Sequence, residues 1–504
     1  MGSEWKEVTL GDLFKVKHGF AFKGEFFTDE ATETVCVTPG NFAIGGGFQN
    51  PKPKYYNGPV PEEYILTPGQ VVVTMTDLSK QADTLGFAAI IPDDEYVWLH
   101  NQRVGLLEFK DEIKTDPQFI SYLLRTHQYR SWVIGSASGT TVKHTSPSRI
   151  ESYSCFIPPY DEQVRIGNTL AAYERKIALN RQINTTLESM AQALFKSWFV
   201  DFDPVIDNAL AAGHDIPEPL MQRAQARAAH RALRDCEGGI EAGSLKGEES
   251  EEASEGGREG QGDSNAETRT HPQGPTLPAD LQQLFPDRFV FTEDMGWVPE
   301  GWEVKQLSSM IELIGGGTPK TSIEEYWGGD IPWFSVVDAP NPSDVFVLNT
   351  EKSITQMGLD NSSAKLLAKG TTIISARGTV GKCAVVARPM AMNQSCYGVR
   401  GAFGNADYFT YYMVLRKVHE LQQRSHGSVF STITRDTFKG LNVASCSPLL
   451  TQKFDALIGS HMDRILSNIE QIQILSNLRD SLLPKLLSGQ ITIPDAEQAL
   501  DEVL

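Results

Sequence analysis

Two short segments look like parts of enzyme active sites, but each lacks something that the chemistry requires. Residues 157–160 read Ile-Pro-Pro-Tyr, the tail of the Asn-Pro-Pro-Tyr tetrad with which amino-methyltransferases hold a target base. Ile157 stands where that tetrad needs a side chain that accepts a hydrogen bond from the base amino group. The glycines at 315–317 lack the spacing of a phosphate-binding loop, and Pro319 would disturb its helix start. We therefore expect neither methyl transfer nor nucleotide binding in this chain.

Loops rich in Ser, Thr and Gly offer a different chemistry, because hydroxyls and backbone amides donate hydrogen bonds to phosphates and base edges. Two such loops lie at residues 135–145 and 425–432, and a third lies at 318–321. The alternative is that these hydroxyls only stabilise turns of their own loops. With the lysine that ends segment 19–23, the candidate contacts to nucleic acid are Lys23, Ser138, Thr140, Thr141, Lys143, His144, Thr318, Lys320, Thr321, Ser425, His426, Ser428 and Ser431.

Two arginines stand near the ends of predicted strands, where a long forked donor can reach a target. Arg103 and Arg377 could each bind a guanine through two hydrogen bonds, which discriminates against the wrong base by about 1–3 kcal/mol. A surface salt bridge is the alternative for both. Asn-Gln pairs at 101–102 and 393–394 could read adenine, but they recur in both halves of the chain. Domains that read different sequences should differ where they touch bases, so we expect these pairs to be structural.

The elements that must position these residues come as a tandem duplication. Ile177 and Ile465 head matching apolar heptads at an offset of 288 residues, the difference between 465 and 177. A period this long indicates two globular modules rather than a solenoid, whose repeats run to roughly 20–50 residues. The apolar spacing alternates four and three, which predicts a coiled-coil seam. The seam positions that we expect to make helix or partner contacts are Ile177, Asn180, Leu187, Phe195, Trp198, Ile465, Asn468, Leu475 and Leu482.

The two helices should run from about Asp161 to Trp198 and from about Thr451 to Leu483, with Pro484 bending or ending the second. Asn180 and Asn468 fall on the seam, where a buried polar residue fixes helix register. The alternative is that both asparagines lie in a solvated or partner-facing stretch. The aromatic cluster at 195–199 is more apolar than a two-helix rod needs, which favours contact with a partner subunit. We expect Trp302, Trp327 and Trp333 in the core.

Composition bounds the class of protein. With 504 residues and 40% hydrophobic content, the chain should hold two or more globular domains. The start of the sequence has no signal-peptide pattern and no stretch approaches a membrane span, so we expect a cytoplasmic protein without a membrane partner. The six cysteines form no CxxC pair, which argues against a metal ribbon. We expect neither a metal nor a cofactor in this chain.

The formal net charge of −19 argues at first against nucleic acid. Part of this charge is local, because residues 237–270 hold ten acidic and three basic residues, a net −7. That segment has few large apolar residues, so we expect residues 237–275 to be a disordered insertion whose deletion has little effect on stability. A basic, Ala-rich helix should precede the insertion, with Arg223, Arg227, Arg231 and Arg234 on it. DNA binding would then need basic residues gathered on one face, or a basic partner.

The predicted order along the chain follows from the duplication. β-rich runs at 70–75, 86–91 and 155–157 and a helix at about 119–132 belong to the first module, and 370–375 repeats the first of those runs. The fold class should be α+β. The expected domains are a first module at 1–158, a helix at 159–200, a connector at 201–297, a second module at 298–448, a second helix at 449–490 and a tail at 491–504.

Several strings together resemble the specificity subunit of type I restriction–modification systems. The first module contributes residues 19–23 and 99–105, and the second contributes 316–321, 326–333 and 375–381. Residues 194–199 and 482–487 resemble the family's conserved helices, and 202–205 and 284–289 resemble its central connector. The resemblance covers nearly the whole chain. Each string alone is unspecific, but their order, duplicated around heptad helices, is typical of this family.

The resemblance implies a non-catalytic reader of double-stranded DNA. Each module would be a target-recognition domain that reads one half of a bipartite sequence, and the helices would pack antiparallel, with pseudo-twofold symmetry, as a spacer. The implied partners are two methyltransferase subunits and two restriction and translocation subunits, with S-adenosylmethionine, ATP and Mg²⁺ on those partners. Two alternatives stay open. The chain could be a protein–protein scaffold without DNA readout, or a stand-alone specificity subunit for methylation only.

Overall fold

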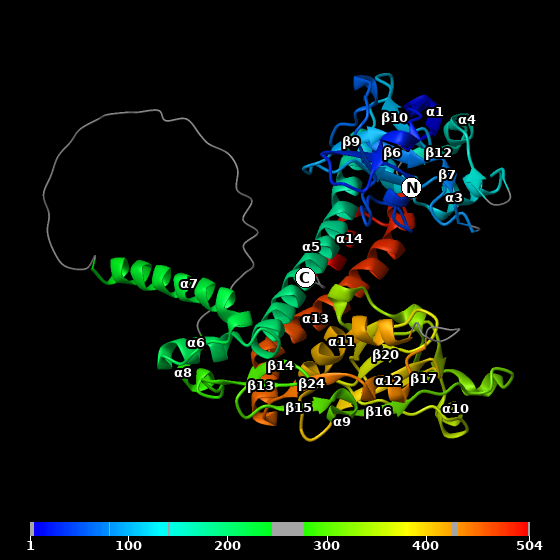
Figure 1. Ribbon diagram of the computed structural model, residues 1–504. Helices are drawn as coiled ribbons and strands as arrows, with labels where there is room; N and C mark the ends of the chain where they lie inside the picture. The colour runs from blue at the N-terminus through cyan, green and yellow to red at the C-terminus, as the bar shows by residue number, and fades with distance from the viewer. Residues whose placement is uncertain (1–4, 80, 140–141, 244–276, 426–431, 502–504) are drawn as a thin grey trace, which may run out of the picture. The chain divides into compact units, whose positions relative to one another are not determined.

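The structure, a computed structural model, describes residues 5–79, 81–139, 142–243, 277–425 and 432–501. Its contacts divide the chain into two compact units, whose elements are labelled in Figure 1. Unit 1 contains Met1–Asn180 and Gln471–Leu504, and unit 2 contains Arg181–Glu470. Each unit therefore combines one globular module with part of each long helix. We call the modules domain 1 and domain 2.

Domain 1 is built around the central strand β6 (Val71–Thr74), which is buried at all four positions. Val71 and Val73 pack into one apolar core, while Val72 belongs to a second core that contains Trp98. Successive residues of a strand point to opposite faces, so this sheet separates two apolar layers. A run of valines therefore suffices to specify a strand that is covered on both sides.

Two four-stranded sheets and two short ribbons make up the β-structure of domain 1. One sheet has the order β2-β10-β6-β8 and is antiparallel, and the other has the order β3-β5-β4-β9 with β4 and β9 parallel. The ribbons pair β1 with β12 and β7 with β11. The remaining strands are β1 (Lys6–Thr9), β2 (Phe14–His18), β3 (Phe27–Thr28), β4 (Thr34–Val37), β5 (Tyr55–Tyr56), β7 (Thr76–Asp77), β8 (Ala88–Ile90), β9 (Val97–His100), β10 (Val104–Phe109), β11 (Lys143–His144) and β12 (Ser154–Ile157).

The helices of domain 1 are α1 (Leu10–Leu13), α2 (Pro117–Leu123), α3 (His127–Ile134) and α4 (Pro147–Glu151). The single helix expected at 119–132 is wrong, because α2 and α3 are separate. Thr126 has an extended backbone and its side chain accepts a hydrogen bond from the backbone of Tyr129, so it begins a new helix. Apolar periodicity continues through this break, which is why the sequence pattern did not reveal it.

Over the described residues, domain 2 repeats this plan with one strand more in its larger sheet. Its sheets have the orders β16-β23-β20-β21-β18, β19-β17-β22 and β15-β24. In β20, Ile373 and Ile374 face different cores, as the valines of β6 do. The strands are β15 (Glu303–Gln306), β16 (Ile311–Gly315), β17 (Trp327–Phe334), β18 (Phe346–Val347), β19 (Ser353–Ile354), β20 (Thr372–Ser375), β21 (Cys383–Val386), β22 (Ala391–Met392), β23 (Cys396–Gly401) and β24 (Asn442–Ser445).

One long helix, α11 (Asp407–Ser425), stands in domain 2 where domain 1 has α2 and α3. The shorter helices of domain 2 are α9 (Leu307–Met310), α10 (Gln356–Asp360) and α12 (Arg435–Lys439). The parallel pairing of β17 with β22 matches that of β4 with β9. The duplication predicted from the helices therefore extends to the topology of the modules, whose sequences agree only loosely.

The two long helices are α5 (Tyr160–Phe199) and α13 (Pro448–Leu487), and each contributes to both units. Within each unit they run antiparallel. In unit 1, Tyr173 and Ile177 pack with Leu475. In unit 2, the rings of Trp198 and Phe454 lie 5.9 Å apart. α13 contains Pro484 and continues beyond it to Leu487, so of the two outcomes expected for this proline, a bend or an end of the helix, the end is wrong.

Packing explains why α13 continues past its proline. Leu486 and Leu487 are buried in the core of unit 1 and hold the last turn in place. Pro484 removes one helical hydrogen bond, the one to the carbonyl four residues earlier, and burial of these leucines offsets that cost. The C-terminal segment then forms α14 (Ile493–Asp501), and the backbone of Ala496 accepts a hydrogen bond from the Tyr173 hydroxyl at 2.7 Å.

Both seam asparagines are fully buried, so the solvated alternative for them is wrong. In unit 1, Asn180 donates to Gln471 at 2.7 Å. In unit 2, Asn468 donates to Asn184 at 2.8 Å. These polar pairs are compatible with one helix register only, because a slip would bury each amide against apolar side chains without a partner.

The aromatic cluster at 195–199 lies inside unit 2, so the expected contact with a partner subunit is wrong. Phe195, Trp198 and Phe199 are 6%, 1% and 8% exposed, and the ring of Phe195 lies 5.7 Å from that of Phe409. The excess of apolar surface on this turn of α5 packs against α11 and domain 2 instead. Replacing a buried aromatic of this kind with alanine costs about 3–5 kcal/mol. Of the three tryptophans expected in the core, Trp302 and Trp333 are buried and Trp327 is half-buried.

The connector folds into helices α6 (Asp203–Ala212), α7 (Glu218–Gly243) and α8 (Ala279–Gln282) and the hairpin of β13 (Phe289–Thr292) and β14 (Gly296–Pro299). The basic helix predicted here is α7, which takes in residues 237–243 of the expected insertion; residues 244–276 lie outside the described part of the chain. Arg223 and Arg227 bind the carboxylates of Asp203 and Asp207 on α6. Their charges are therefore used inside the connector.

Over the described residues, no helix combines the length and apolar character that crossing a bilayer requires. Within the same residues, His, Cys, Asp and Glu side chains do not gather in any group of three that could hold a metal ion.

Glu188 on α5 is a buried carboxyl that connects this helix to α11 of domain 2. It is 3% exposed, accepts a hydrogen bond from the Tyr412 hydroxyl on α11, and accepts another from Gln192 at 3.0 Å. Burial raises the pKa of Glu188 to about 7, although both hydrogen bonds oppose this shift. The carboxyl is therefore only partly ionised at neutral pH.

Replacing Glu188 with Gln should change how stability depends on pH. The unfolded chain releases this proton near pH 4.5 and the folded chain near pH 7, so the free energy of unfolding falls as pH rises between these values. The parent chain should lose free energy of unfolding between pH 4.5 and about pH 8, whereas Glu188→Gln should not. The difference in free energy of unfolding between them should therefore change by about 3 kcal/mol in favour of the variant. Urea unfolding at both pH values measures this, with the exposed Glu470→Gln on α13 as control. Parallel pH profiles for the parent chain and Glu188→Gln would contradict the assignment.

The Asn184–Asn468 pair should behave as a unit. Asn184→Leu alone leaves the Asn468 amide buried without its acceptor, which costs about 1–3 kcal/mol. The double variant Asn184→Leu/Asn468→Leu should recover most of that loss, because two apolar groups then face each other. A double-mutant cycle by urea denaturation measures the coupling, and additive losses would show that the pair does not set the register.

Candidate nucleic-acid interface

Five segments of domain 1 meet at one edge, which we call edge 1 (residues 19–23, 75–77, 101–103, 138–139 and 142–145). The backbone of Met75 donates to Arg103 at 3.0 Å, and its carbonyl accepts from Thr145 at 3.0 Å. Thr76 pairs with His144 in the ribbon of β7 and β11, and Ser138 bridges to His144. The structure therefore brings together Arg103, Ser138 and His144, three of the predicted contact residues.

Domain 2 has an equivalent edge 2 (residues 316–320, 376–378, 393–395 and 432–433). The backbone of Ala376 donates to Ser395 at 2.7 Å, and its carbonyl accepts from Ile433 at 2.9 Å. Arg377 bridges to Thr432. Each of these contacts has its counterpart in edge 1, so Met75 corresponds to Ala376, Arg103 to Ser395 and His144 to Thr432.

A glycine makes the same close approach in both edges. A Cβ on Gly19 would lie 2.3 Å from the carbonyl oxygen of Asn101, and one on Gly316 would lie 1.9 Å from that of Asn393. Both distances are too short for any other residue, so each edge needs glycine at this position.

The recurring asparagines hold the turn that crosses each edge. The Asn101 side chain accepts from the backbone of Arg103 at 3.0 Å, and the Asn393 side chain accepts from that of Ser395 at 3.0 Å. Both are asparagine turns that fix the chain between two strands. The structural role predicted for these asparagines from their recurrence is confirmed.

Against this shared backbone, the exposed side chains differ between the edges. Edge 1 presents Arg103 in the turn, whereas edge 2 has the half-buried Ser395 there. Edge 2 presents Arg377 after β20, whereas the counterpart in edge 1, Thr76, is 6% exposed and lies 3.2 Å from the ring nitrogen of His144. Neither arginine forms an ion pair with a residue that the structure describes, so the salt bridge considered for them has no partner there.

Each edge carries a lysine at the same spacing along the chain from its close-packed glycine. Lys23 and Lys320 each stand four residues after the close-packed glycine, and both are exposed. The backbone of Lys320 is fixed by the indole of Trp327, which donates to its carbonyl at 3.3 Å, and Trp333 donates to Gly317 at 2.9 Å. A lysine common to two edges with different side chains is suited to the DNA backbone, which is the same everywhere.

The remaining predicted contacts have varied surroundings. Thr318 is half-buried and donates to the side chain of Gln394, Thr321 is exposed, and Lys143 is half-buried in β11. Thr140, Thr141, His426, Ser428 and Ser431 lie outside the described residues, and Ser425 ends α11 with a side chain that is not described.

The two edges also contain Thr76 and Gln394, which were not among the contacts predicted from the sequence. Neither lies in a Ser-, Thr- and Gly-rich loop, and Gln394 was set aside with the recurring pairs. Aligning β6 with β20 pairs Thr76 with Arg377, and this comparison was the signal available in the sequence.

A hydroxyl-lined cavity of about 450 Å³ adjoins edge 1. Arg149 lies beside it, stacked 3.4 Å from the Trp132 ring and donating to the Trp132 carbonyl at 2.8 Å. These groups can hydrogen-bond phosphate oxygens without reading a base. The cavity is lined by Ser136, Ser138, His144, Thr145, Ser146, Ser148, Arg149 and Ser152.

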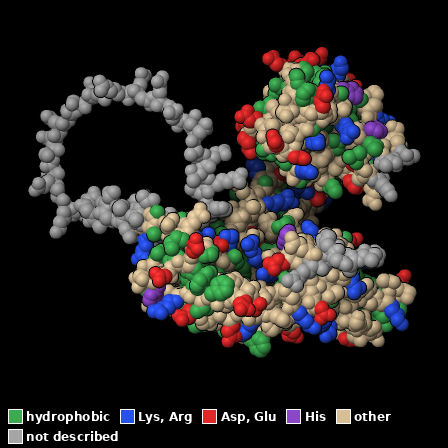
Figure 2. Space-filling view, in the orientation of Figure 1, with side chains coloured by type: hydrophobic (Ala, Val, Ile, Leu, Met, Phe, Trp, Pro, Cys, Tyr) green, Lys and Arg blue, Asp and Glu red, His purple; other side chains and the backbone are tan. Residues whose placement is uncertain are grey.

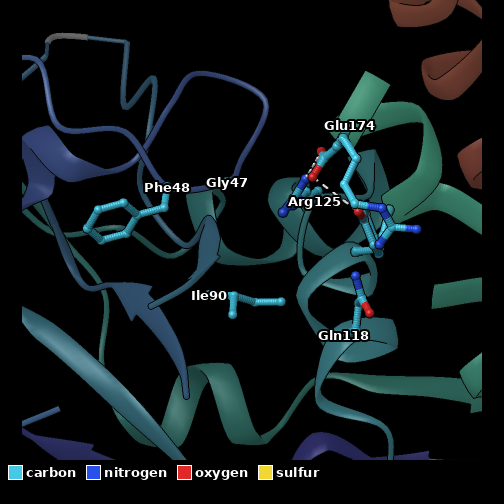
Figure 3. A pocket seen from close by; sticks show the side chains of 9 residues that line it. Gly47, Phe48, Ile90, Gln118, Arg125 and Glu174 are labelled. Carbon is cyan, nitrogen blue, oxygen red and sulfur yellow. Dashed lines mark hydrogen bonds and ion pairs between the residues drawn. The ribbon is translucent and has the colours of Figure 1, made fainter. Parts of the chain in front are cut away.

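A second cavity of about 210 Å³ lies where domain 1 meets α5 (Figure 3). The charged side chains beside it join domain 1 to the helices of unit 1. Arg125 points toward Glu174, with which it forms an ion pair, and the Tyr122 hydroxyl donates to Glu174 at 3.1 Å. Arg479 on α13 lies 3.7 Å from the same carboxylate. The Arg125 side chain is only 6% exposed, so this cluster fixes domain 1 to both helices of unit 1.

In unit 2 the equivalent joint uses α11. Asp455 on α13 accepts hydrogen bonds from the backbones of Tyr408 and Phe409, each at 2.8 Å, and so caps the first turn of α11. Glu188 on α5 holds the same helix one turn further along. Each edge is thus carried by a domain whose orientation on its helices is set by buried or half-buried carboxylates.

The chain matches relatives over most of its length. The family model described as type I restriction modification DNA specificity domain matches twice, at residues 2–189 and 299–479. The HindI specificity subunit of Haemophilus influenzae is 30% identical over 387 residues, which cover 74% of this chain and 77% of that protein. The MjaIX specificity subunit of Methanocaldococcus jannaschii is 30% identical over 187 residues, 37% of this chain and 43% of that protein.

A solved structure supports the fold. The S subunit of a type I restriction–modification system from M. genitalium superposes with a TM-score of 0.52 at 14% identity, covering 96% of this chain and 97% of that one. The fold class and family predicted from the sequence are confirmed. The chain belongs to the type I restriction modification DNA specificity family and is a specificity subunit with two target-recognition domains.

Proposed function

We propose that edge 1 and edge 2 each read one half of a bipartite DNA target, while α5 and α13 set the spacing and dock two methyltransferase subunits. The supporting observation is that the edges share a backbone scaffold, contact by contact, and differ in the side chains it presents. A scaffold for proteins alone has no reason to combine these two properties. Specific readout of two different half-sites requires both, because a common frame must present different donors.

The chain itself performs no catalytic step in this proposal. Methyl transfer to adenine from S-adenosylmethionine belongs to the two methyltransferase subunits, and ATP- and Mg²⁺-dependent translocation and cleavage belong to two restriction subunits. The chain recognises the target sequence on the DNA. Its residues bind and orient the duplex, so that the methyltransferase subunits meet one adenine in each half.

The acidity of the chain bears on how tightly it binds DNA alone. The net charge is −19, and in Figure 2 acidic and basic side chains are interspersed over the visible face of each unit. Arg223 and Arg227 are already paired with carboxylates. Much of the phosphate neutralisation should therefore come from partner subunits.

Methylome sequencing tests the proposal directly. A host that expresses the methyltransferase subunit with this chain should carry adenine methylation at one motif, two short specific halves around a fixed gap. Without the chain, that methylation should disappear. Methylation that is unchanged without the chain would sink the reading role and leave a protein scaffold as the better description.

Changes at one edge should alter one half only. Ser138→Ala/His144→Ala should relax or weaken the half read by domain 1, and Thr318→Ala/Thr321→Ala should do so for the other half, since the edges belong to separate units. Losing one good base contact costs about 1–3 kcal/mol. The same methylome measurement checks this, with Ser481→Ala on α13 as control. Simultaneous change of both halves would argue against independent readers.

Salt dependence should separate the chain from the assembled complex. The isolated chain should bind the target duplex weakly, with a shallow slope of log K against log salt, because its net charge is −19. With methyltransferase subunits the slope should steepen by about 0.9 for each added phosphate contact. Fluorescence anisotropy measures both slopes. The salt concentration should run from about 50 to about 200 mM, where DNA affinity changes strongly with salt. Equal slopes would mean that the partners contribute no phosphate contacts.

A further inference from the structure

The geometry points to Arg103 and Arg377 as the guanine-reading side chains of the two edges, at non-equivalent places on one scaffold, with Lys23 and Lys320 as a common phosphate contact. This inference rests on the proposed reading function and adds to it a division of labour among named residues. It also predicts a feature of the target, namely that the guanines of the two halves lie at different positions, counted outward from the gap.

The correspondence between the edges places the arginines at different positions. Arg103 lies in the turn held by Asn101, and its counterpart is Ser395. Arg377 follows β20, and its counterpart is Thr76. No single position of the scaffold thus carries arginine in both edges.

The surroundings of these positions make the difference functional. Thr76 is buried and lies within hydrogen-bond distance of His144, so edge 1 cannot present a donor from the place of Arg377 except through the histidine ring. Ser395 is half-buried, and its short side chain cannot extend as far as Arg103 does. Each edge therefore offers one long forked donor, and the two donors leave the scaffold from non-equivalent segments, the turn after β9 and the end of β20.

The chemistry of the free guanidinium selects guanine. Arg103 and Arg377 are exposed and have no ion-pair partner among the described residues, so their donors are not already used. A planar fork matches the O6 and N7 acceptors that guanine presents together in the major groove. By contrast, the two lysines are compact charges that stand at the same spacing from the close-packed glycine in both edges. A side chain that both readers keep cannot account for a difference between their sequences, so its natural contact is phosphate.

The test uses the complete methyltransferase complex and a library of duplexes in which every position of both halves is randomised. Methylation measured by sequencing gives the preference at each position. Arg377→Ala should lower the preference for guanine at one position of the domain 2 half by about 5- to 150-fold, and leave the other positions intact. Arg377→Lys should not restore it, because the bidentate fork is lost. Arg103→Ala should do the same at one position of the domain 1 half.

Lys320→Ala and Lys23→Ala serve as the matched controls. Each should lower methylation of all library members alike, with the consensus unchanged, and reduce the salt slope by about one contact. Counted outward from the gap, the positions relaxed by Arg103→Ala and Arg377→Ala should differ. If both variants relax the same position, the arginines are equivalent after all and that part of the inference is overturned. If either variant leaves the consensus unchanged, or weakens methylation of all sequences alike, that arginine does not read a base.

Failure of this inference can be told from failure of the proposed function. A parent complex without bipartite preference in the library would sink the function itself. A bipartite preference that survives both arginine substitutions would sink only the arginine assignment. All four side chains are exposed, and co-purification with the methyltransferase subunits at unchanged stoichiometry verifies that each variant still folds and assembles.

Discussion

The antiparallel seam between α5 and α13 is the constraint on which the rest of each unit depends. Apolar residues bury most of it, but buried amides interrupt it where Asn180 meets Gln471 in unit 1 and Asn468 meets Asn184 in unit 2. An apolar seam alone tolerates slippage by a heptad, because one leucine packs nearly as well as the next. The amides remove that freedom, since a shifted helix leaves them buried without partners.

Each domain is then fastened to this fixed frame through charged side chains taken out of water. Unit 1 uses the half-buried Glu174 with two arginines, and unit 2 uses Glu188 and Asp455 against α11. The two joints do the same work with different chemistry, so the duplicated modules have diverged even where they attach. A carboxylate removed from water demands a specific partner geometry, which fixes orientation more tightly than apolar contact does.

The edges follow the same division between what is kept and what varies. Glycine recurs because the close backbone approach leaves no room for a Cβ, and asparagine recurs because its side chain accepts the hydrogen bond that fixes the turn. The side chains that leave this scaffold are unconstrained by packing, so they are free to differ between the domains. A reader of two unlike half-sites needs that combination, since rigidity of the frame gives each donor a defined place.

Much of the molecule was determined by local pattern in the sequence. The heptads, the duplication, the valine-rich strands and the buried asparagines follow from periodicity and residue type, which act over a few turns of the chain. Tertiary structure alone decided that Phe195 and Trp198 pack inside unit 2, that α13 continues past Pro484, and that Thr76 lies beneath His144 while its counterpart Arg377 is exposed. These outcomes depend on contacts between residues far apart in the sequence, and no local spacing encodes which loops will meet.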